Sequence, residues 1–248
     1  MYQLINQKIF NTITGRRYFV KKNNKKIFSV RKYAGSSVSR ASTFFTREPE
    51  TVNWIDNFKT ETNFLDVGAN IGIYSLYAAS KKHKVVSLEP ESLNFFLLNI
   101  NIKDNEFEKY IKAYPLSAGE KIDINDLNLM NFKFGGTGHS FGSKIGPDLK
   151  EFKPVYSQGS ASFDLDTFVD KISFKPNNIK IDVDGNENLV VNGMQRLLHS
   201  KELKSILIEA NKKNTRNLEA IEKIKSHGFK ENLKSGNENQ DNYILTRV

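Results

Sequence analysis

The stretch from Phe64 to Ser75 (FLDVGANIGIYS) constrains the fold of this chain more than any other part of it. Its apolar residues predict a buried strand over residues 64–67 and, at helical spacing, a helix from residue 73 onwards. A glycine-containing turn over residues 68–72 joins the two. An acidic residue at the end of a strand, followed by such a turn, is typical of α/β sheets that receive nucleotide-like ligands. The stretch therefore predicts a ligand site at the carboxyl edge of a sheet.

The spacing within the turn distinguishes between two kinds of ligand. The dinucleotide fingerprint G-x-G-x-x-G would need glycine where Asn70 and Ile73 stand, so a pyrophosphate cradle is not expected. The pattern D-x-G-x-N-x-G instead resembles motif I of class I S-adenosylmethionine (SAM) dependent methyltransferases. Its residues are Asp66, Gly68, Asn70 and Gly72. The resemblance implies that this loop wraps the methionine half of SAM.

Two further polar residues follow predicted strands at positions that suit the same cofactor. Residues 84–88 predict a second strand, and Glu89 after it lies 21 residues beyond Gly68, where nucleotide-binding sheets place an acid for ribose hydroxyls. The alternative is that Glu89 caps the next helix, because acids favour helix starts. A third strand is predicted over residues 108–113, and Ser117 follows it. SAM enzymes commonly bind the adenine amino edge there.

The rest of the chain continues to alternate strands with helices, which predicts an α/β fold with a parallel sheet and right-handed crossovers. Further strands are predicted over residues 178–182 and 204–209, and a final antiparallel hairpin over residues 229–233 and 243–247. The resemblance implies a class I methyltransferase fold. This is a Rossmann-like, mostly parallel seven-stranded sheet that ends in an antiparallel hairpin.

A segment at about 120–163 interrupts this alternation of strands and helices. It is rich in glycine and serine and predicts an inserted hairpin with a mobile loop. Because a loop of this length is usually functional or disordered, we interpret it as an active-site lid that contacts the acceptor. His139 is the one side chain in it that titrates near neutral pH, but a lone loop histidine is weak evidence for catalysis.

Four carboxylates follow the fourth and fifth predicted strands, at the edge where open α/β sheets bind ligands. They are Asp182, Asp184, Glu187 and Glu209. Methyl transfer to a hydroxyl requires the protein to position the acceptor and remove its proton, and a partly buried carboxylate can do both. Asp182 is the leading catalytic candidate, with Glu187 and Glu209 beside it.

Two alternatives for these carboxylates remain open. Asp184 and Glu187 have the spacing of a capping box at the start of the next helix. Asp182 and Glu209 could instead hold a divalent metal, although their spacing is not specific for one. We predict no metal, and the zero cysteines and four scattered histidines agree with this.

Together these motifs resemble the FkbM family of SAM-dependent methyltransferases. The motifs are DVGANIG, LEPES, the Leu-Ser pair at Ser117, IKIDVDGNE and LIEAN. The resemblance runs from about Glu48 to the C-terminus and implies O-methylation of a hydroxyl on a sugar, glycan, glycolipid or polyketide. The family more often has Glu where Asp184 stands. We therefore expect a methyltransferase domain over residues 48–248 and an N-terminal extension over residues 1–47.

The net charge of +9 comes entirely from the extension, because residues 1–47 contain eleven Lys and Arg but no Asp or Glu. Its pattern predicts a short helix or docking arm over residues 2–13, a hairpin around Asn23-Asn24 and a loop over residues 36–42. One interpretation is that these basic residues only form a solvent-exposed surface. The other is that the extension delivers an anionic acceptor to the mouth of the active site. The residues concerned are Lys21, Lys22, Lys25, Lys26, Arg31, Arg40 and Arg47.

Two other kinds of function are weighed against this one. A nucleic-acid methyltransferase would use the basic extension, but the extension lacks a regular helix with a basic stripe, and nucleic acid is not the expected partner. A catalytically silent SAM-fold binding protein is disfavoured by the intact motif I and by Asp182. The longest apolar runs are too short to span a bilayer, and we expect a cytoplasmic protein.

Overall fold

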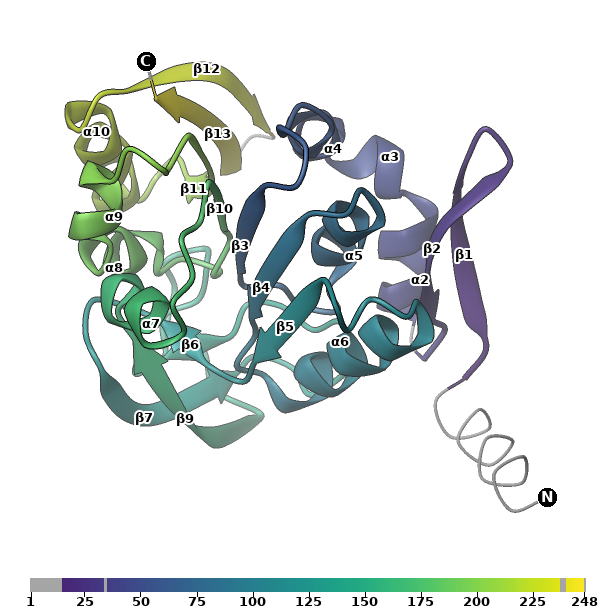
Figure 1. The fold of residues 1–248 in the computed structure, drawn as a ribbon. Coiled ribbons are helices and arrows are strands. Elements are labelled where there is room, and N and C mark those ends of the chain that lie inside the picture. Colours follow the sequence, from purple (N-terminus) through teal and green to yellow (C-terminus); the bar gives the residue numbers. More distant parts are fainter. Residues whose placement is uncertain (1–14, 34, 237–239, 248) are drawn as a thin grey trace.

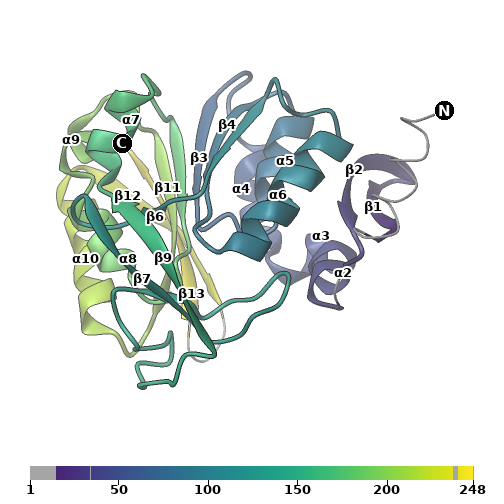
Figure 2. The ribbon, with the colours of Figure 1, turned by 90° about the horizontal axis from the view of Figure 1, so that it is seen from below.

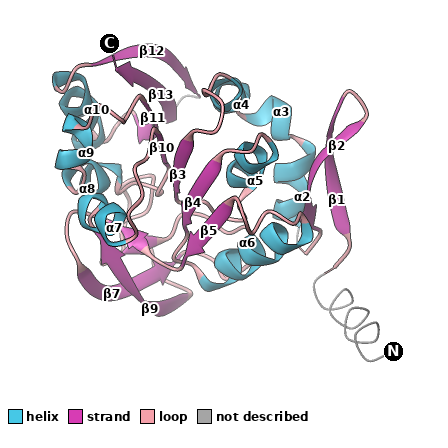
Figure 3. Ribbon diagram, viewed as in Figure 1, coloured by secondary structure: helices cyan, strands magenta, loops and turns pink. Residues whose placement is uncertain are grey.

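A mixed β-sheet forms the centre of the computed structural model, which describes residues 15–33, 35–236 and 240–247. Its strands are β3 (Asn63–Val67), β4 (Lys84–Leu88), β5 (Ile111–Tyr114), β10 (Asn178–Ile181), β11 (Ser205–Asn211), β12 (Phe229–Gly236) and β13 (Gln240–Arg247). Within the described residues the sheet has seven strands in the order β12-β13-β11-β10-β3-β4-β5 (Figure 1, Figure 3). Neighbours from β11 to β5 are parallel, whereas β13 is antiparallel to both β11 and β12.

Successive side chains of the strands point to opposite faces of the sheet and build two hydrophobic cores. Phe64 and Val85 belong to one core, whereas the residues that follow them, Leu65 and Val86, belong to the other. Helices α4 (Pro49–Asp56), α5 (Ile73–Ser80) and α6 (Ser92–Asp104) cover the first face. Helices α7 (Leu165–Lys171), α8 (Glu187–Asn192), α9 (Gln195–His199) and α10 (Thr215–Ser226) cover the second (Figure 2). With both faces covered, the strand ends are the place for a ligand.

Most of the predicted elements are confirmed, and three differences concern where the elements begin or end. The third strand, β5, begins at Ile111 instead of residue 108. The sequence predicts a short helix over residues 162–169, but residues 162 and 163 belong to a strand and the helix begins at Leu165. The sequence also predicts one helix that follows the fourth strand and runs through Leu198, but this helix is divided into α8 and α9 at Gly193. A Cβ on Gly193 would lie 2.1 Å from the Gly119 carbonyl oxygen, so a close backbone contact breaks the helix there.

The inserted segment forms a sheet of its own. It contains β6 (Ser117–Ala118), β7 (Asp123–Leu129), β8 (Ser140–Phe141) and β9 (Tyr156–Phe163), in the order β6-β9-β7-β8. The antiparallel pairing of β7 with β9 confirms the predicted hairpin. This second sheet lies beside the carboxyl edge of the central one, so the loop between β7 and β8 can reach the site (Figure 1).

The basic segment packs onto the first core. Strands β1 (Arg17–Lys22) and β2 (Lys25–Arg31) form the predicted hairpin, and Asn23 and Asn24 take positive φ angles of 50° and 60°. The predicted loop over residues 36–42 is wrong, because these residues form helix α2 (Gly35–Ser42), followed by α3 (Phe44–Arg47). Burial of Ala41 in the core outweighs the weak helix preference of serine. The segment predicted over residues 2–13 lies outside the described residues. No helix in the described part of the chain is long and apolar enough to cross a membrane.

The hairpin is fixed to helix α6 by one ion pair and several hydrogen bonds. The Arg31 guanidinium pairs with the Asp104 carboxylate, with Nη2 2.8 Å from Oδ1, and the two side chains are only 4% and 12% exposed. The Arg31 backbone N–H donates to Asn101 Oδ1, and the Ser29 backbone N–H donates to Asn105 Oδ1. Arg31 is therefore committed to the interior and is not available to an acceptor, contrary to the sequence-based expectation.

Replacing Arg31 by Met should destabilise the protein by about 3 kcal/mol, because it leaves the Asp104 carboxylate buried without its partner. Urea unfolding followed by circular dichroism measures this. Lys103→Met is the matched control, since it removes the neighbouring exposed pair with Glu108 and should leave the unfolding midpoint nearly unchanged. Equal midpoints for the Arg31 variant and the wild type would contradict the assignment.

Candidate functional site

The turn between β3 and α5 is built for close backbone contact. Gly68 has a φ of +82°, and a Cβ there would lie 1.8 Å from the Asp182 carbonyl oxygen at the end of β10. Gly72 has a φ of +87°, and a Cβ there would lie 2.3 Å from a Leu98 methyl group. Only glycine fits either position, so the turn stays close to β10 on one side and α6 on the other.

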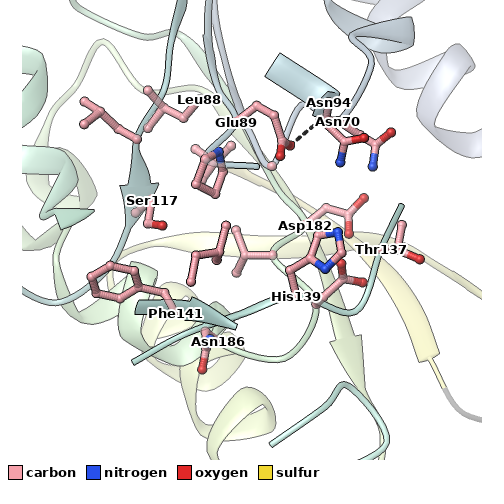
Figure 4. A pocket seen from close by; sticks show the side chains of 18 of the residues that line it. Asn70, Leu88, Glu89, Asn94, Ser117, Thr137, His139, Phe141, Asp182 and Asn186 are labelled. Carbon is pink, nitrogen blue, oxygen red and sulfur yellow. Dashed lines mark hydrogen bonds between the residues drawn. The ribbon is translucent and has the colours of Figure 1, made fainter. Parts of the chain in front are cut away.

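A cavity opens above this turn, between the central sheet and the inserted sheet. Gly68, Asn70, Glu89 and Ser117, predicted to bind the cofactor, all line it (Figure 4). Figure 4 shows Ser117 and Phe141 toward one end of the cavity and Thr137 toward the other. The space between the lining atoms is about 720 Å³, a volume that includes the open mouth.

Glu89 lies in the wall of this cavity and does not cap helix α6. Its carboxylate accepts hydrogen bonds from the backbone N–H groups of Asn70 (2.7 Å) and Glu91 (2.9 Å). Glu91 is the residue whose side chain caps α6, by accepting from the N–H groups of Leu93 and Asn94. Burial raises the pKa of Glu89 to about 8, despite those two hydrogen bonds.

Ser117 also fits a ligand contact. Its Oγ is buried and has no hydrogen-bond partner among the described residues. A buried polar atom without a partner is costly, and a bound ligand would satisfy it. By contrast, two of the predicted cofactor residues do not line the cavity. Gly72 lies at the start of α5, and Asp66 faces the protein interior.

Asp66 is buried on the first face of the sheet, directly opposite Lys180 in the parallel pairing of β3 with β10. The Ser75 hydroxyl donates to its Oδ2 (2.5 Å). Burial raises the pKa of Asp66, while the positive charge of Lys180 opposes that rise. The acid of motif I is thus a partner for a buried lysine beneath the cavity.

A second cavity adjoins the first at the carboxyl end of β10. Four side chains line both cavities: Arg40, Thr137, Asp182 and Asp184. The second cavity is otherwise bounded by polar groups, which include Arg47, Glu48, Glu50, Glu209, Asp241 and Asn242. Asp182 therefore lies at the junction of the two cavities.

Asp182 is held in place by Lys180. The Lys180 ammonium donates to Asp182 Oδ2 (2.6 Å), and the lysine is 2% exposed whereas the aspartate side chain is 28% exposed. Burial by itself lowers the pKa of Lys180, but the charges of Asp182, Asp66 and Glu48 raise it above its ordinary value. The ammonium also lies over the Tyr74 ring, 5.3 Å from its centre.

Glu209 lines the second cavity and is protonated at neutral pH. The charge of Asp182, together with burial, raises the pKa of Glu209 to about 9. The described residues contain no group of three acidic or histidine side chains arranged to hold a metal ion.

The capping box predicted for Asp184 and Glu187 is wrong, because α8 begins at Glu187 with Asn186 as its cap. Asp184 has a φ of 56° and accepts a hydrogen bond from the Gly138 N–H (2.7 Å), and burial raises its pKa to about 6. Glu187 lines neither cavity. Its carboxylate accepts from the N–H groups of Val183 and Gly185, and its pKa is raised to about 7 by burial.

Asn217 of α10 also donates to Glu187, at 2.6 Å. Glu187 therefore fixes the turn that carries Asp184, and the structure does not place its carboxylate beside a substrate.

The loop between β7 and β8 contributes Gly136, Thr137 and His139 to the wall of the cofactor cavity. The side-chain amides of Asn70 and Asn94 both donate to the Gly136 carbonyl oxygen (2.8 and 3.0 Å). His139 follows on this loop and lines the cofactor cavity, and burial lowers its pKa to about 4. His139 is therefore neutral at physiological pH, and neither ring nitrogen has a partner within the described part of the protein.

Several residues at the site were not predicted from the sequence. Asn94, Thr137 and Glu48 had no recognisable motif, and their positions depend on contacts between distant segments. Conversely, the hairpin lysines at positions 21, 22, 25 and 26 line neither cavity. The positive charges that do line them belong to Arg40 and Arg47.

Comparison with known proteins agrees with this geometry. A family model described as the methyltransferase FkbM domain matches residues 66–231, more than half of the chain. No curated protein matches the sequence closely enough to count as a relative.

Two solved structures have a TM-score of 0.50 to this chain, and at 10–11% identity they are similar in fold alone. One is a precorrin-6y C5,15-methyltransferase from Geobacter metallireducens, with 11% identity over 81% of this chain and 87% of that one. The other is aTrm5 in a complex with tRNALeu, with 10% identity over 94% of this chain and 53% of that one. They confirm the predicted Rossmann-like methyltransferase fold.

The raised pKa values predict that the ligand-free protein loses stability as the pH rises. The folded state holds protons on Asp184, Glu187, Glu89 and Glu209 up to pH values of about 6, 7, 8 and 9, whereas the unfolded chain releases them near pH 4. The free energy of unfolding should therefore fall between pH 6 and pH 8.5, on the order of 1.4 kcal/mol per group and pH unit.

Urea unfolding at several pH values measures this slope. Glu209→Gln should flatten it, because glutamine resembles the protonated acid and does not titrate. A slope of the same size in this variant would contradict the assignment to Glu209.

Proposed function

Because the chain belongs to the FkbM family of SAM-dependent methyltransferases, we propose that it transfers the methyl group of SAM to a hydroxyl of a sugar, glycan or glycolipid. The observation that carries this proposal is the second cavity, which adjoins the cofactor cavity at Asp182 and whose polar lining is mostly acids, together with two hydroxyl groups and the Asn242 amide. Carboxylates and amides are groups that hydrogen-bond a polyhydroxyl acceptor well.

The residues of the first cavity fit SAM. Glu89 suits the ribose hydroxyls, the free Oγ of Ser117 suits the adenine edge, and the Gly68–Asn70 backbone suits the methionine half. When bound, SAM supplies an electrophilic methyl group on its sulfonium. The chain has to bind this cofactor, exclude water and present the acceptor in line.

We propose that Asp182 orients the acceptor hydroxyl and takes its proton. Methyl transfer would form the bond from the acceptor oxygen to the methyl carbon and break the bond from that carbon to the sulfonium sulfur, which leaves S-adenosylhomocysteine. The Asp182 carboxylate would take the hydroxyl proton. Lys180 fixes that carboxylate at the junction of the cavities through its 2.6 Å hydrogen bond. Glu209, protonated at neutral pH, can donate a hydrogen bond to a second acceptor oxygen.

A nucleobase acceptor fits this cavity less well. Enzymes that act on bases commonly stack the base between aromatic or apolar side chains. No aromatic side chain is among the described residues that line the second cavity. The alternatives of a nucleic-acid methyltransferase and of a catalytically silent protein are separated by experiment. Consumption of SAM is measured against sugars, glycolipids and RNA, and turnover of RNA alone would refute the proposal.

Asp182→Asn should lower kcat by about 10²- to 10⁴-fold, because it keeps the shape of the side chain and removes the base. Glu209→Gln is the matched control, since it mimics the protonated acid and should retain most of the activity. Both are measured as steady-state methyl transfer at pH 7.5 on the acceptor found by the screen. Full activity of the Asp182 variant, or equal loss in both, would exclude this division of roles.

We also propose that the acceptor carries an anionic group and that Arg47 binds it. Arg47 lies in the wall of the second cavity and its side chain is 45% exposed, with Nε 3.8 Å from Glu48 Oε1. A guanidinium fork suits phosphate or carboxylate. Arg47→Gln should raise KM for the acceptor about 10-fold, and added salt should raise it in the wild type.

Replacing the exposed hairpin residues Lys25 and Lys26 by Gln is the matched test of the extension. It should leave KM unchanged, because these lysines line neither cavity. A rise in KM for the lysine variant but not the Arg47 variant would place the anion on the hairpin instead.

A further inference from the structure

The titratable side chains of the cofactor cavity are mostly acids. Glu89, Asp182 and Asp184 line it, and His139 is neutral because burial lowers its pKa to about 4. Among the described residues that line this cavity, Arg40 is the one with a positive charge. A ligand with both positive and negative groups would therefore find several acids as partners for its positive groups. Arg40 would be the one cationic partner for its negative group.

Arg40 lies in the last turn of α2, before the part of the chain that matches the family model. The helix is fixed beside the cavity, because Ala41 is buried in the first core and the Ser36 hydroxyl donates to the Phe134 carbonyl oxygen (2.5 Å). The Arg40 guanidinium interacts electrostatically with Asp184. It makes no hydrogen bond or ion pair with any other described residue, so its donors are available to a ligand.

The position of Arg40 matches the length of an extended cofactor. Glu89 and Ser117 suit the adenosine end, whereas Arg40 and Thr137 line the junction with the second cavity. Figure 4 shows Ser117 and Thr137 at opposite ends of the space. SAM carries a sulfonium, an ammonium and a carboxylate. Its two cations suit the acids of the cavity, and the carboxylate needs a cationic donor.

We infer that Arg40 binds the carboxylate of SAM and that the N-terminal segment thereby completes the cofactor site. This inference rests on the SAM-dependent activity of the family. Two parallel N–H groups of the guanidinium can hold both carboxylate oxygens. Arg47 remains available to the acceptor, because it lines the second cavity and not the first.

Comparing the binding of two ligands distinguishes the contact with the carboxylate from the contacts with the adenosine. S-adenosylhomocysteine carries the amino-acid carboxylate and ammonium, whereas 5′-methylthioadenosine keeps the adenosine and lacks both. Isothermal calorimetry measures the dissociation constant of each for the wild type, Arg40→Met, Arg40→Lys and Arg47→Met. The full chain is used throughout.

Arg40→Met should weaken S-adenosylhomocysteine binding by about 10- to 100-fold, which is about 1.4 to 2.8 kcal/mol. Its affinity for 5′-methylthioadenosine should change less than about twofold, which also shows that the adenosine site is intact. Arg40→Lys keeps the charge but not the fork and should recover part of the loss. Arg47→Met is the matched control and should bind both ligands like the wild type.

Equal weakening of both ligands by Arg40→Met would overturn the inference, because the effect would then lie in the adenosine site or the fold. Unchanged binding of both, with a higher acceptor KM, would also overturn it and would assign Arg40 to the acceptor. The family function is tested separately by the wild type. If it bound neither ligand, the methyltransferase assignment itself would fail.

Discussion

A single buried ammonium group, that of Lys180, determines how the acids of the site are arranged. Strand alternation places Ile179 and Ile181 in the second core, so Lys180 points to the opposite face and is buried there. A buried cation without partners would be very unfavourable. Asp66 across the sheet and Asp182 two residues along the strand supply those partners.

The protonation pattern of the site follows from this arrangement. Asp182 forms an ion pair with Lys180, and the charge of Asp182 acts on the acids nearby. It raises the pKa of Glu209 to about 9 and contributes to the raised pKa of Asp184. Environments that separate the protonation states of neighbouring acids allow one to accept a proton while another donates a hydrogen bond. The division of roles between Asp182 and Glu209 thus begins with a lysine inside the sheet.

The sequence predicted the parts of the site that depend on local pattern. The βα turn, Glu89 and the strand ending at Asp182 each require particular residues within a few positions, and all were placed correctly. Asp66 shows the limit of such patterns. It lies opposite Lys180 of another strand, 114 positions further along the chain, and no local sequence signal reveals this pairing. The capping-box spacing at Asp184 was equally misleading. The Asp184 carboxylate instead accepts a hydrogen bond from the Gly138 N–H, which belongs to a loop distant in the sequence.

The N-terminal segment is the part whose role depends most on tertiary structure. Its charge suggested a surface for binding, but Val20, Phe28 and Val30 are buried in the same core as helix α5. The hairpin thereby becomes part of the folding unit that bears the cofactor turn. Because helices α2 and α3 follow that hairpin directly, its packing also sets the position of Arg40 and Arg47 at the two cavities. The segment outside the family match therefore contributes cations to a site whose other charged groups are mostly acids.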